Sequence, residues 1–293
     1  MKALIVGLGF GQAVYKPILS KLGYEICTVD LKDGANYTNV DHAVRDHGKF
    51  DIVHICTPNY THENLARQVA PYADIIFVEK PGVINHTAWH NLIKDFDARV
   101  MMVKNNQYRA EIDEFKRLAK ESNAVNIRWD SKNRIPQPGS WFTTKNLAFG
   151  GVSRDLIPHM LSYFTALTDY IASTKNYVLA HQQYTLSDID DTDYGVVNKD
   201  GIYNVDDFCS FEFVDAENIN WTLTANWKNN KEDDSSISFH LKDGNILKFN
   251  LGLCPEEAYE KMIKTAVENL NNDKFWKSQY EQDMWIHRQI EQI

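Results

Sequence analysis

A glycine-rich turn near the N-terminus has the residue types that bind a phosphate group. Gly7, Gly9 and Gly11 follow a short apolar run and precede a stretch with helical spacing. Such glycines let backbone N–H groups approach a pyrophosphate at the start of a helix, where the helix dipole favours anions. The usual dinucleotide fingerprint has its third glycine at position 12, which here is Gln12, so Gly11 stands one residue early. The turn therefore predicts a dinucleotide site with an irregular glycine pattern.

Asp30 indicates which dinucleotide this site prefers. It ends the second apolar run, 19 residues past Gly11. A carboxylate there can accept hydrogen bonds from ribose hydroxyls and repels a 2′-phosphate, so we expect NAD rather than NADP. Lys32 is near enough in sequence to soften this repulsion, and NADP stays open as the alternative. Phe10 lies within the turn and is expected to line the same site, unless the glycines serve only a tight strand–helix turn.

Three further side chains could move a proton to or from a substrate hydroxyl. Lys80 follows an apolar run and precedes Pro81, which restricts the lysine to extended conformations. A partly desolvated lysine can bind or deprotonate a hydroxyl. Asp155 and His159 are four residues apart, so a helix would place them on one face, where the carboxylate can polarise the imidazole. A surface lysine and a packed histidine are the alternatives, and since no third ligand is evident we expect no metal site.

The first 122 residues must position Lys80 and the glycine turn. Short apolar runs alternate there with helical patterns, as in a parallel sheet covered by helices. We expect strands at Ala3–Leu8, Tyr24–Asp30, Asp51–Cys56, Asp74–Val78 and Arg99–Val103, and helices at His62–Val69 and His86–Phe96. This predicts a doubly wound α/β domain over residues 1–122, with Lys80 at the carboxyl end of a strand, where such sheets bind ligands.

Residues 123–293 show longer runs, several of which alternate apolar and polar residues, as in an antiparallel sheet with one covered face. The expected strands are 126–131, 177–185, 208–214, 220–227, 236–241 and 246–251. The last two flank Asp243-Gly244, which is typical of a tight hairpin. One helix is expected at Ser153–Leu167, and helical structure from Pro255 to the C-terminus. The second domain, residues 123–293, is therefore expected to be α+β with a large, open, mainly antiparallel sheet.

Three motifs make a family resemblance specific. The chain reads Thr-Pro-Asn-Tyr-Thr-His at 57–62, Glu-Lys-Pro at 79–81 and Gly-Gly-Val-Ser-Arg-Asp-Leu-Ile-Pro-His at 150–159. Together with the glycine turn, these closely resemble the Gfo/Idh/MocA family of NAD(P)-dependent oxidoreductases over the whole chain. The resemblance implies a Rossmann domain followed by an α+β domain, and a catalytic set of Lys80, Asp155 and His159. It also implies hydride transfer between nicotinamide and a secondary alcohol or hemiacetal carbon of a sugar, polyol or related small metabolite.

The same resemblance implies further binding residues. The cofactor is expected to contact Thr57, Pro58, His62, Glu79 and Lys80. The substrate is expected to contact Arg109 and Trp141 besides the catalytic set, with a sheet-capping role as the alternative for Arg109. Ser162 stands where the family often has Asp, and Phe142 follows Trp141 where it often has Arg. These departures put a heavily hydroxylated sugar in doubt as the substrate.

Composition excludes several classes of protein. The 293 residues include 31 basic and 40 acidic side chains, a formal charge of −9. Because the basic residues are scattered, we expect no nucleic-acid partner. No apolar run approaches the roughly 18 to 20 residues of a membrane span, and no signal-peptide pattern is evident, so we expect a cytoplasmic protein without a membrane partner. The four cysteines are far apart and are expected to be reduced thiols.

Apolar residues recur along two expected strands of the second domain. They are Phe208, Phe211 and Phe213, followed by Trp221, Leu223, Ala225 and Trp227. These rows predict more apolar surface than one helix layer hides, and hence a homodimer or homotetramer that forms through the C-terminal sheet.

Two other functions remain as alternatives. One is an NAD(P)H-dependent reductase of a C=C or C=N substrate, similar to biliverdin reductases, which typically lack the Lys-Asp-His set. The other is a non-catalytic regulator that binds a dinucleotide. The presence of Lys80, Asp155 and His159 together counts against both.

Overall fold

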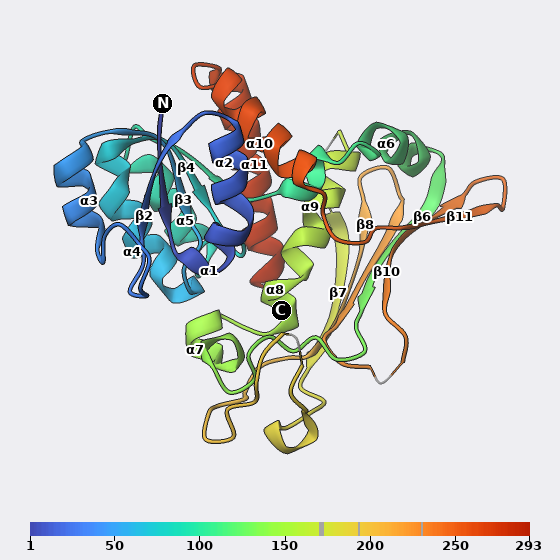
Figure 1. The fold of residues 1–293 in the computed structure, drawn as a ribbon. Helices are drawn as coiled ribbons and strands as arrows, with labels where there is room; N and C mark the ends of the chain where they lie inside the picture. The colour runs from blue at the N-terminus through green and yellow to red at the C-terminus, as the bar shows by residue number, and fades with distance from the viewer. Residues whose placement is uncertain (170–172, 193, 230) are drawn as a thin grey trace. The chain divides into compact units, whose positions relative to one another are not determined.

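The chain forms two compact units. The computed structural model describes residues 1–169, 173–192, 194–229 and 231–293. The first unit combines Met1–Tyr108 with Pro255–Arg288, and the second combines Arg109–Cys254 with Gln289–Ile293. Each unit contains one sheet with its own helices (Figure 1). Among the residues described, no helix is long and apolar enough to cross a membrane.

The sheet of the first unit is parallel throughout, which confirms the doubly wound prediction. Its strands are β1 (Lys2–Val6), β2 (Glu25–Val29), β3 (Phe50–Ile55), β4 (Ala73–Val78) and β5 (Arg99–Met102). They lie in the order β2-β1-β3-β4-β5. The strand order therefore reverses between β1 and β3, and open α/β sheets bind ligands at such a switch point, beyond the carboxyl ends of the strands.

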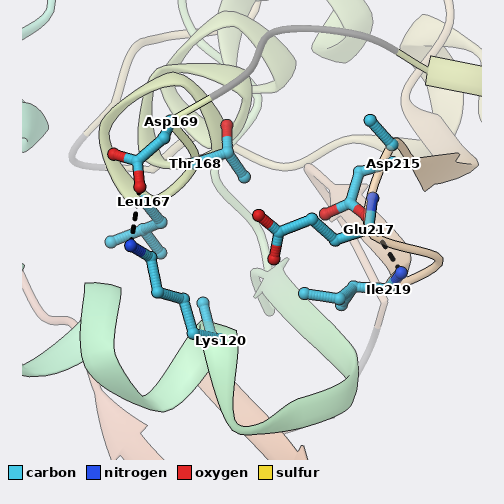
Figure 2. A pocket seen from close by; sticks show the side chains of 9 residues that line it. Lys120, Leu167, Thr168, Asp169, Asp215, Glu217 and Ile219 are labelled. Carbon is cyan, nitrogen blue, oxygen red and sulfur yellow. Dashed lines mark hydrogen bonds and ion pairs between the residues drawn. The ribbon is translucent and has the colours of Figure 1, made fainter.

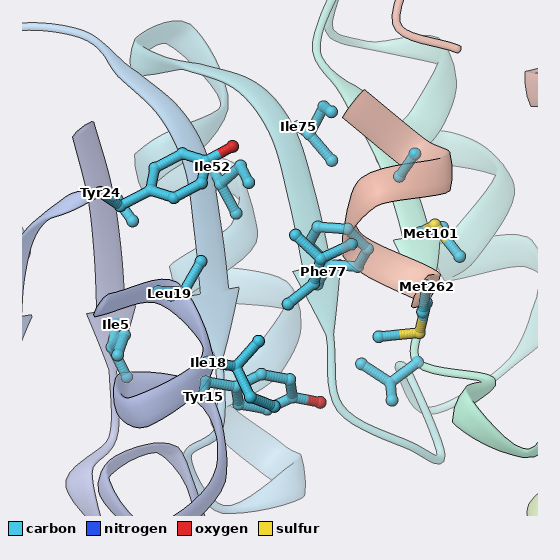
Figure 3. Packing of buried hydrophobic residues seen from close by; sticks show 14 of the residues in the cluster. Ile5, Tyr15, Ile18, Leu19, Tyr24, Ile52, Ile75, Phe77, Met101 and Met262 are labelled. Atoms are coloured by element: carbon cyan, nitrogen blue, oxygen red, sulfur yellow. The ribbon is translucent and has the colours of Figure 1, made fainter. Parts of the chain in front are cut away.

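Short helices follow the strands of this sheet. They are α1 (Leu8–Phe10), the π-helical turn η1 (Gly11–Tyr15), α2 (Lys16–Lys21), α3 (Val40–His47), α4 (His62–Val69) and α5 (His86–Lys94). Asn39 and Asn85 cap α3 and α5, because each side chain accepts a backbone N–H three residues further on. Apolar residues of α2 and of the strands, such as Leu19, Ile5 and Phe77, form one buried cluster (Figure 3).

Two C-terminal helices, α10 (Glu256–Glu268) and α11 (Asp273–Ile290), contribute to the first unit. Met262 and Ile263 of α10 are 0% exposed and belong to the same apolar cluster as Phe77 (Figure 3). Burying one such side chain contributes about 1.5–3 kcal/mol. The helical stretch that we expected after Pro255 is thus two helices, and its apolar face completes the core of the first unit.

The second unit contains a mixed six-stranded sheet. Its strands are β6 (Ser122–Asp130), β7 (Ser173–His181), β8 (Phe208–Asp215), β9 (Asn220–Asn226), β10 (Asp234–Leu241) and β11 (Ile246–Asn250). The order is β11-β10-β6-β9-β8-β7, with β6 and β9 parallel and the other neighbours antiparallel. The hairpin that Asp243-Gly244 predicts joins β10 to β11, and Gly244 has a φ of 91°. A large, mainly antiparallel sheet is therefore confirmed.

Helices α6 (Ile112–Lys120), α7 (Lys145–Ala148), α8 (Val152–Asp155) and α9 (Ile157–Leu167) belong to the second unit. The single helix predicted over Ser153–Leu167 is wrong, since α8 and α9 are separated at Leu156. Pro158 lies in the first turn of α9, where its missing N–H costs little, whereas it would remove a hydrogen bond inside a continuous helix.

The apolar rows of β8 and β9 face the helices. The ring of Phe164 in α9 lies 4.9 Å from the rings of both Phe213 and Trp221. Phe211 and Leu223 are 0% exposed, while the residues that alternate with them are polar, such as Glu212 and Thr222. Except for Phe208, which is partly exposed, these rows are therefore buried within one unit, so they no longer argue for an oligomer, and the homodimer or homotetramer stays a prediction.

Candidate functional site

The glycine turn lies between the carboxyl end of β1 and the first helix. Gly7 has a φ of 97°, and a Cβ atom there would lie 2.7 Å from the carbonyl carbon and oxygen of Cys56. Only glycine allows the ends of β1 and β3 to pass so closely. A Cβ atom on Gly9, by contrast, would meet nothing within 4 Å. This open space fits the approach of a dinucleotide pyrophosphate to the backbone, and the neighbouring Phe10 is 44% exposed.

Gly11 does the packing that the fingerprint assigns to its third glycine. A Cβ atom on Gly11 would lie 2.6 Å from Cγ2 of Ile5, so the helix approaches β1 too closely for any other residue. Gly11 also begins the π turn that ends at Tyr15. A π turn holds one residue more than an α turn, so the residues after it take the register they would have with a glycine at position 12. The backbone thus compensates for the irregular spacing.

Asp30 links the glycine turn to the end of β2. Its Oδ2 accepts the backbone N–H of Leu8 at 2.6 Å, and its Oδ1 accepts the N–H of Lys32 at 2.9 Å. An ionised carboxylate has about four lone-pair sites, so both oxygens can still accept a ribose hydroxyl. The Lys32 side chain is exposed. The residues of this turn therefore fit NAD, with a negative charge placed against an added phosphate.

The Glu79-Lys80-Pro81 motif forms a turn directly after β4. The Lys80–Pro81 peptide bond is cis. One carboxylate oxygen of Glu79 accepts the Tyr15 hydroxyl at 2.6 Å, and the carboxylate also accepts the backbone N–H of Lys80. Burial raises the pKa of Glu79, while the Tyr15 hydrogen bond and the charge of Lys80 oppose that rise. The Glu79 side chain is therefore held against the backbone of Lys80.

His62 joins the loops that follow β3 and β4. It is fully buried at the start of α4, with Nδ1 2.7 Å from the carbonyl oxygen of Gly82 and Nε2 2.8 Å from that of Thr57. Both ring nitrogens face backbone acceptors, so neither is left for a ligand. Burial lowers the pKa of His62, and the two carbonyls partly offset this by favouring the protonated ring. The geometry supports a positioning role, and direct contact of His62 with the cofactor stays a prediction.

Thr57 and Pro58 form the loop after β3. The hydroxyl of Thr61 donates to the carbonyl oxygen of Pro58 at 2.7 Å and lies 2.6 Å from the hydroxyl of Thr57. Because the single hydrogen of Thr61 is directed at Pro58, Thr57 is the donor of the second bond. The Thr57 hydroxyl can therefore act toward a ligand only as an acceptor.

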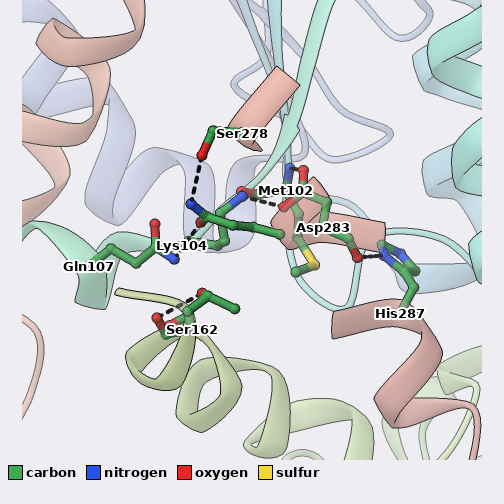
Figure 4. A network of polar contacts seen from close by, with 9 residues as sticks. Met102, Lys104, Gln107, Ser162, Ser278, Asp283 and His287 are labelled. Carbon is green, nitrogen blue, oxygen red and sulfur yellow. Dashed lines mark hydrogen bonds and ion pairs between the residues drawn. The ribbon is translucent and has the colours of Figure 1, made fainter. Parts of the chain in front are cut away.

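Helix α11 supports the loop that carries Lys80, through residues that no sequence motif singled out. Lys104 and Asp283 form an ion pair in which both side chains are 0% exposed, and Oδ2 of Asp283 accepts the N–H of Met102 at 3.0 Å (Figure 4). One turn further along α11, Nδ1 of His287 donates to the carbonyl oxygen of Asp283 at 2.7 Å and Nε2 accepts the N–H of Val83. These contacts tie α11 to β5 and to the segment after Pro81.

In the second unit, Asp206 holds the Gly150-Gly151 turn, and no motif pointed to it. Its carboxylate accepts the N–H of Gly151 at 2.9 Å and that of Ser153 at 2.7 Å, which caps α8. A Cβ atom on Gly151 would lie 1.8 Å from the carbonyl oxygen of Asp206, and one on Gly150 would lie 2.6 Å from Cγ of Arg154. Close packing therefore requires both glycines and fixes the helix that ends at Asp155.

Asp155 ends α8, and His159 lies in the first turn of α9. Oδ2 of Asp155 accepts the indole N–H of Trp227 at 3.0 Å, and Trp227 is 1% exposed. The ring of His159 lies 5.6 Å from the ring of Trp129. Leu156, between the two helices, keeps right-handed helical backbone angles, and the pairing of Asp155 with His159 stays a prediction. A buried tryptophan orients the Asp155 carboxylate.

Arg109 and Trp141 have different surroundings. Arg109 is 5% exposed, and its Nη2 donates to the carbonyl oxygens of Leu251 at 2.6 Å and Leu253 at 3.0 Å. These bonds fix the chain after β11, which supports the structural alternative for Arg109. Trp141 is partly exposed and stacks on Phe142 with ring centroids 3.8 Å apart. Its contact with substrate stays a prediction.

The predicted residues divide between the two units. The first unit holds the predicted cofactor residues: Gly7, Gly9, Phe10, Gly11, Asp30, Thr57, Pro58, His62, Glu79 and Lys80. The second holds Arg109, Trp141, Asp155 and His159. Within the first unit, the parallel pairing of β1, β3 and β4 brings the glycine turn, the Thr57 loop and the Lys80 turn to one edge of the sheet.

A small hollow in the second unit contains none of the predicted residues. It is lined by the end of α6, the end of α9 and the turn between β8 and β9 (Figure 2). Asp169 in this hollow forms ion pairs with Lys116 and with Lys120, each at 2.6 Å, so the negative charge of Asp169 is compensated within the protein. Across the described ranges, no group of three or more His, Cys, Asp or Glu side chains is placed to hold a metal ion.

Comparison with known proteins bears on the first unit most directly. Residues 1–106 match the model of an oxidoreductase family with an NAD-binding Rossmann fold, GFO_IDH_MocA. The chain is also 24% identical over 192 residues to a protein of Amycolatopsis mediterranei (strain S699) named as a UDP-kanosamine synthase oxidoreductase subunit. That match covers 60% of this chain and 54% of the relative, so the chain spans about half the length of the curated relative it matches.

Solved structures extend the likeness to the whole chain. GenD2 from gentamicin A biosynthesis, in complex with NAD, has a TM-score of 0.80 at 17% identity, with 99% of this chain and 92% of that chain covered. A myo-inositol dehydrogenase from Corynebacterium glutamicum ATCC 13032 has a TM-score of 0.71 at 14% identity, with 99% and 96% covered. These likenesses confirm the fold of both units. Residues 1–106 thus match the model of the Gfo/Idh/MocA oxidoreductase family with its NAD-binding Rossmann fold, as the resemblance implied.

Proposed function

We propose that the protein is an NAD-dependent dehydrogenase that oxidises a secondary alcohol or hemiacetal carbon of a sugar, polyol or related small metabolite. The family of residues 1–106 supports an oxidoreductase. The structural relatives include a myo-inositol dehydrogenase, and the curated relative is named after a nucleotide-linked aminosugar. A ring-shaped substrate that carries hydroxyl groups is common to both names.

The observation that carries this proposal is the contrast among the three glycines of the turn. Gly7 and Gly11 are needed because backbone and side-chain atoms lie too close for a Cβ atom, whereas Gly9 faces open space. Packing therefore explains two glycines, and close approach of a ligand to the backbone explains the third. Asp30, joined to this turn through Leu8, would receive the ribose hydroxyls.

Bound NAD supplies a nicotinamide ring that accepts the hydride. Lys80 would bind the substrate hydroxyl, and His159 would take its proton as the carbon is oxidised. Asp155 would stabilise the positive charge that then develops on the imidazole, and the indole of Trp227 keeps the Asp155 carboxylate in place. Glu79 and His62 would hold the loops that present Lys80 and Thr57.

Nucleotide binding tests the cofactor part of the proposal. In a thermal-shift titration with NAD⁺, NADH, NADP⁺ and NADPH, a ligand at about 100 times its dissociation constant should stabilise the protein by about 2.7 kcal/mol. We expect NAD(H) to stabilise and NADP(H) to have little effect. Gly9→Ala should leave the melting temperature of the ligand-free protein unchanged and abolish the NAD(H) shift, because its methyl group occupies open space. Binding of NAD(H) by this variant with wild-type affinity would contradict the proposed approach of the pyrophosphate to the backbone at Gly9.

Turnover tests the catalytic part. Purified protein with NAD⁺ is screened against cyclic polyols, sugars and nucleotide-linked sugars, and NADH formation is followed by absorbance. Lys80→Ala should lose turnover by about a hundredfold or more at saturating NAD⁺. Lys94→Ala, which changes an exposed lysine in the same unit, is the matched control and should retain wild-type rates. Equal rates for the two variants would refute the role of Lys80.

A further inference from the structure

Tyr15 occupies a special position in the backbone of the first unit. It is the last residue of the π turn that begins at Gly11, and its side chain is 0% exposed. In a regular α turn after Gly11, Val14 and Tyr15 would share the inward face; the extra residue of the π turn moves that face toward Tyr15. Val14 is accordingly only partly buried. π turns of this kind are frequent at functional sites, and the contacts of Tyr15 are therefore candidates for a functional role.

The ring of Tyr15 is fixed on several sides. It stacks on His54 with ring centroids 4.0 Å apart, and Phe10 and Tyr259 meet it edge-on at 5.9 Å. These contacts leave the ring little freedom, so the direction of its O–H is set by packing. That O–H donates to Oε1 of Glu79 at 2.6 Å, across 64 residues of sequence.

Glu79 in turn contacts the backbone of Lys80. Its carboxylate accepts the Lys80 N–H, and the groups that face it are the Tyr15 hydroxyl, the charge of Lys80 and the Cys56 thiol. Burial raises the pKa of Tyr15 well above its usual value, so the phenol remains a hydrogen-bond donor at every working pH. Burial also disfavours the charged form of Glu79, whereas the bond from Tyr15 favours it. A continuous path therefore runs from the π turn to the residue that precedes Pro81.

We propose that Tyr15 is a positioning residue that acts on Lys80 through Glu79. By donating to the Glu79 carboxyl group, it holds this group against the Lys80 backbone, which fixes the direction of the lysine side chain toward the substrate hydroxyl. This inference rests on the proposed function of Lys80. On this proposal, the π turn has two effects: it restores the helix register, and it places the Tyr15 hydroxyl within hydrogen-bond distance of Glu79.

Tyr15→Phe tests the proposal, because it keeps the ring and removes only the donor. Tyr24→Phe, the same change on a buried tyrosine of the same apolar cluster, is the matched control. We expect Tyr15→Phe to lower kcat by about tenfold to a hundredfold with the NAD dissociation constant unchanged. The acidic limb of its pH profile should move to higher pH, since Glu79 becomes protonated more easily. Tyr24→Phe should behave as wild type.

A second readout does not depend on turnover. The carboxyl stretch of protonated Glu79, assigned by its absence in Glu79→Gln, can be titrated by infrared difference spectroscopy in protein without nucleotide. We expect the midpoint to rise in Tyr15→Phe and to stay at the wild-type value in Tyr24→Phe. An unchanged midpoint would overturn the positioning role, as would an additive loss of kcat in the Tyr15→Phe, Glu79→Gln double variant. Wild-type protein that binds NAD without turning over any substrate would instead count against the proposed function, and the infrared midpoint would still decide the contact between Tyr15 and Glu79.

Discussion

Removing one partner of the buried ion pair between Lys104 and Asp283 should strongly destabilise the first unit. Both side chains are 0% exposed, and Lys104 follows β5 whereas Asp283 belongs to α11. Lys104→Met keeps most of the length of the side chain and leaves the carboxylate buried without its counter-charge. Breaking a buried pair in this way costs about 3–5 kcal/mol, a large part of the roughly 5–15 kcal/mol that stabilises a typical protein. For a unit of this size the melting temperature should fall by about 6–20 °C.

The loss should depend on pH in a defined direction. Burial already raises the pKa of Asp283 and the charge of Lys104 opposes that rise, so removing Lys104 raises this pKa further. The native carboxyl of Lys104→Met then binds a proton that the unfolded chain, with a carboxyl pKa of about 3.9, has already lost. The deficit in unfolding free energy relative to wild type should therefore be greatest at neutral pH and should shrink as the pH falls toward 4.

Urea unfolding at several pH values measures this deficit, with Lys94→Met as the surface control. Replacing both partners, as Lys104→Met with Asp283→Leu, should recover most of the loss, because two apolar side chains need no counter-charge. The double variant should still be less stable than wild type by about 1 kcal/mol, because the N–H of Met102 loses its acceptor. The reasoning fails if Lys104→Met costs less than about 1 kcal/mol at neutral pH, or if the double variant is no more stable than the single one.

Two further predictions concern His54 and Gly151. Burial lowers the pKa of His54 from 6.5 to about 3. As the pH falls between these values, the unfolded state binds a proton that the native state does not. The free energy of unfolding should therefore decrease by about 4–5 kcal/mol across that range. His54→Phe keeps the stack with Tyr15 and should flatten the dependence of melting temperature on pH; an equally steep curve would refute this source of acid sensitivity. Gly151→Ala places a Cβ atom 1.8 Å from the carbonyl oxygen of Asp206 and should displace α8, with lost turnover and a lower melting temperature, whereas unchanged values of both would show that the turn can relax.

Much of the first unit could be predicted because its signals are local. The alternation of buried strands and helices follows from apolar runs, and the helix expected at His62–Val69 has the observed bounds. The irregular position of Gly11 was visible in the sequence, but its consequence was not. Whether a misplaced glycine breaks a turn or is compensated by a π turn depends on the backbone path past Ile5, which no local pattern encodes.

The supporting residues could not be predicted because their partners are remote in sequence. Lys104 and Asp283 are 179 residues apart, and Gly151 and Asp206 are 55 apart. A lone buried lysine or aspartate has the same appearance in a sequence as a solvated one. The return of α10 and α11 to the first unit is likewise set by tertiary packing, since an amphipathic helix shows which face is buried but not what buries it.

Irregular backbone occurs at the candidate site residues that the motifs identify, whereas the residues that hold this backbone in place lie outside the motifs. Lys80 is followed by Gly82 with a φ of 81°, Asp155 lies just before a helix break, and Tyr15 ends a π turn. Each of these segments is held by a contact with a side chain from another element. His287 packs against Gly82, the indole N–H of Trp227 donates to Asp155, and the hydroxyl of Tyr15 donates to Glu79. The motifs therefore identify the segments of irregular backbone that carry the candidate site residues. The side chains that hold these segments in place are remote in sequence and can be identified only in the folded structure.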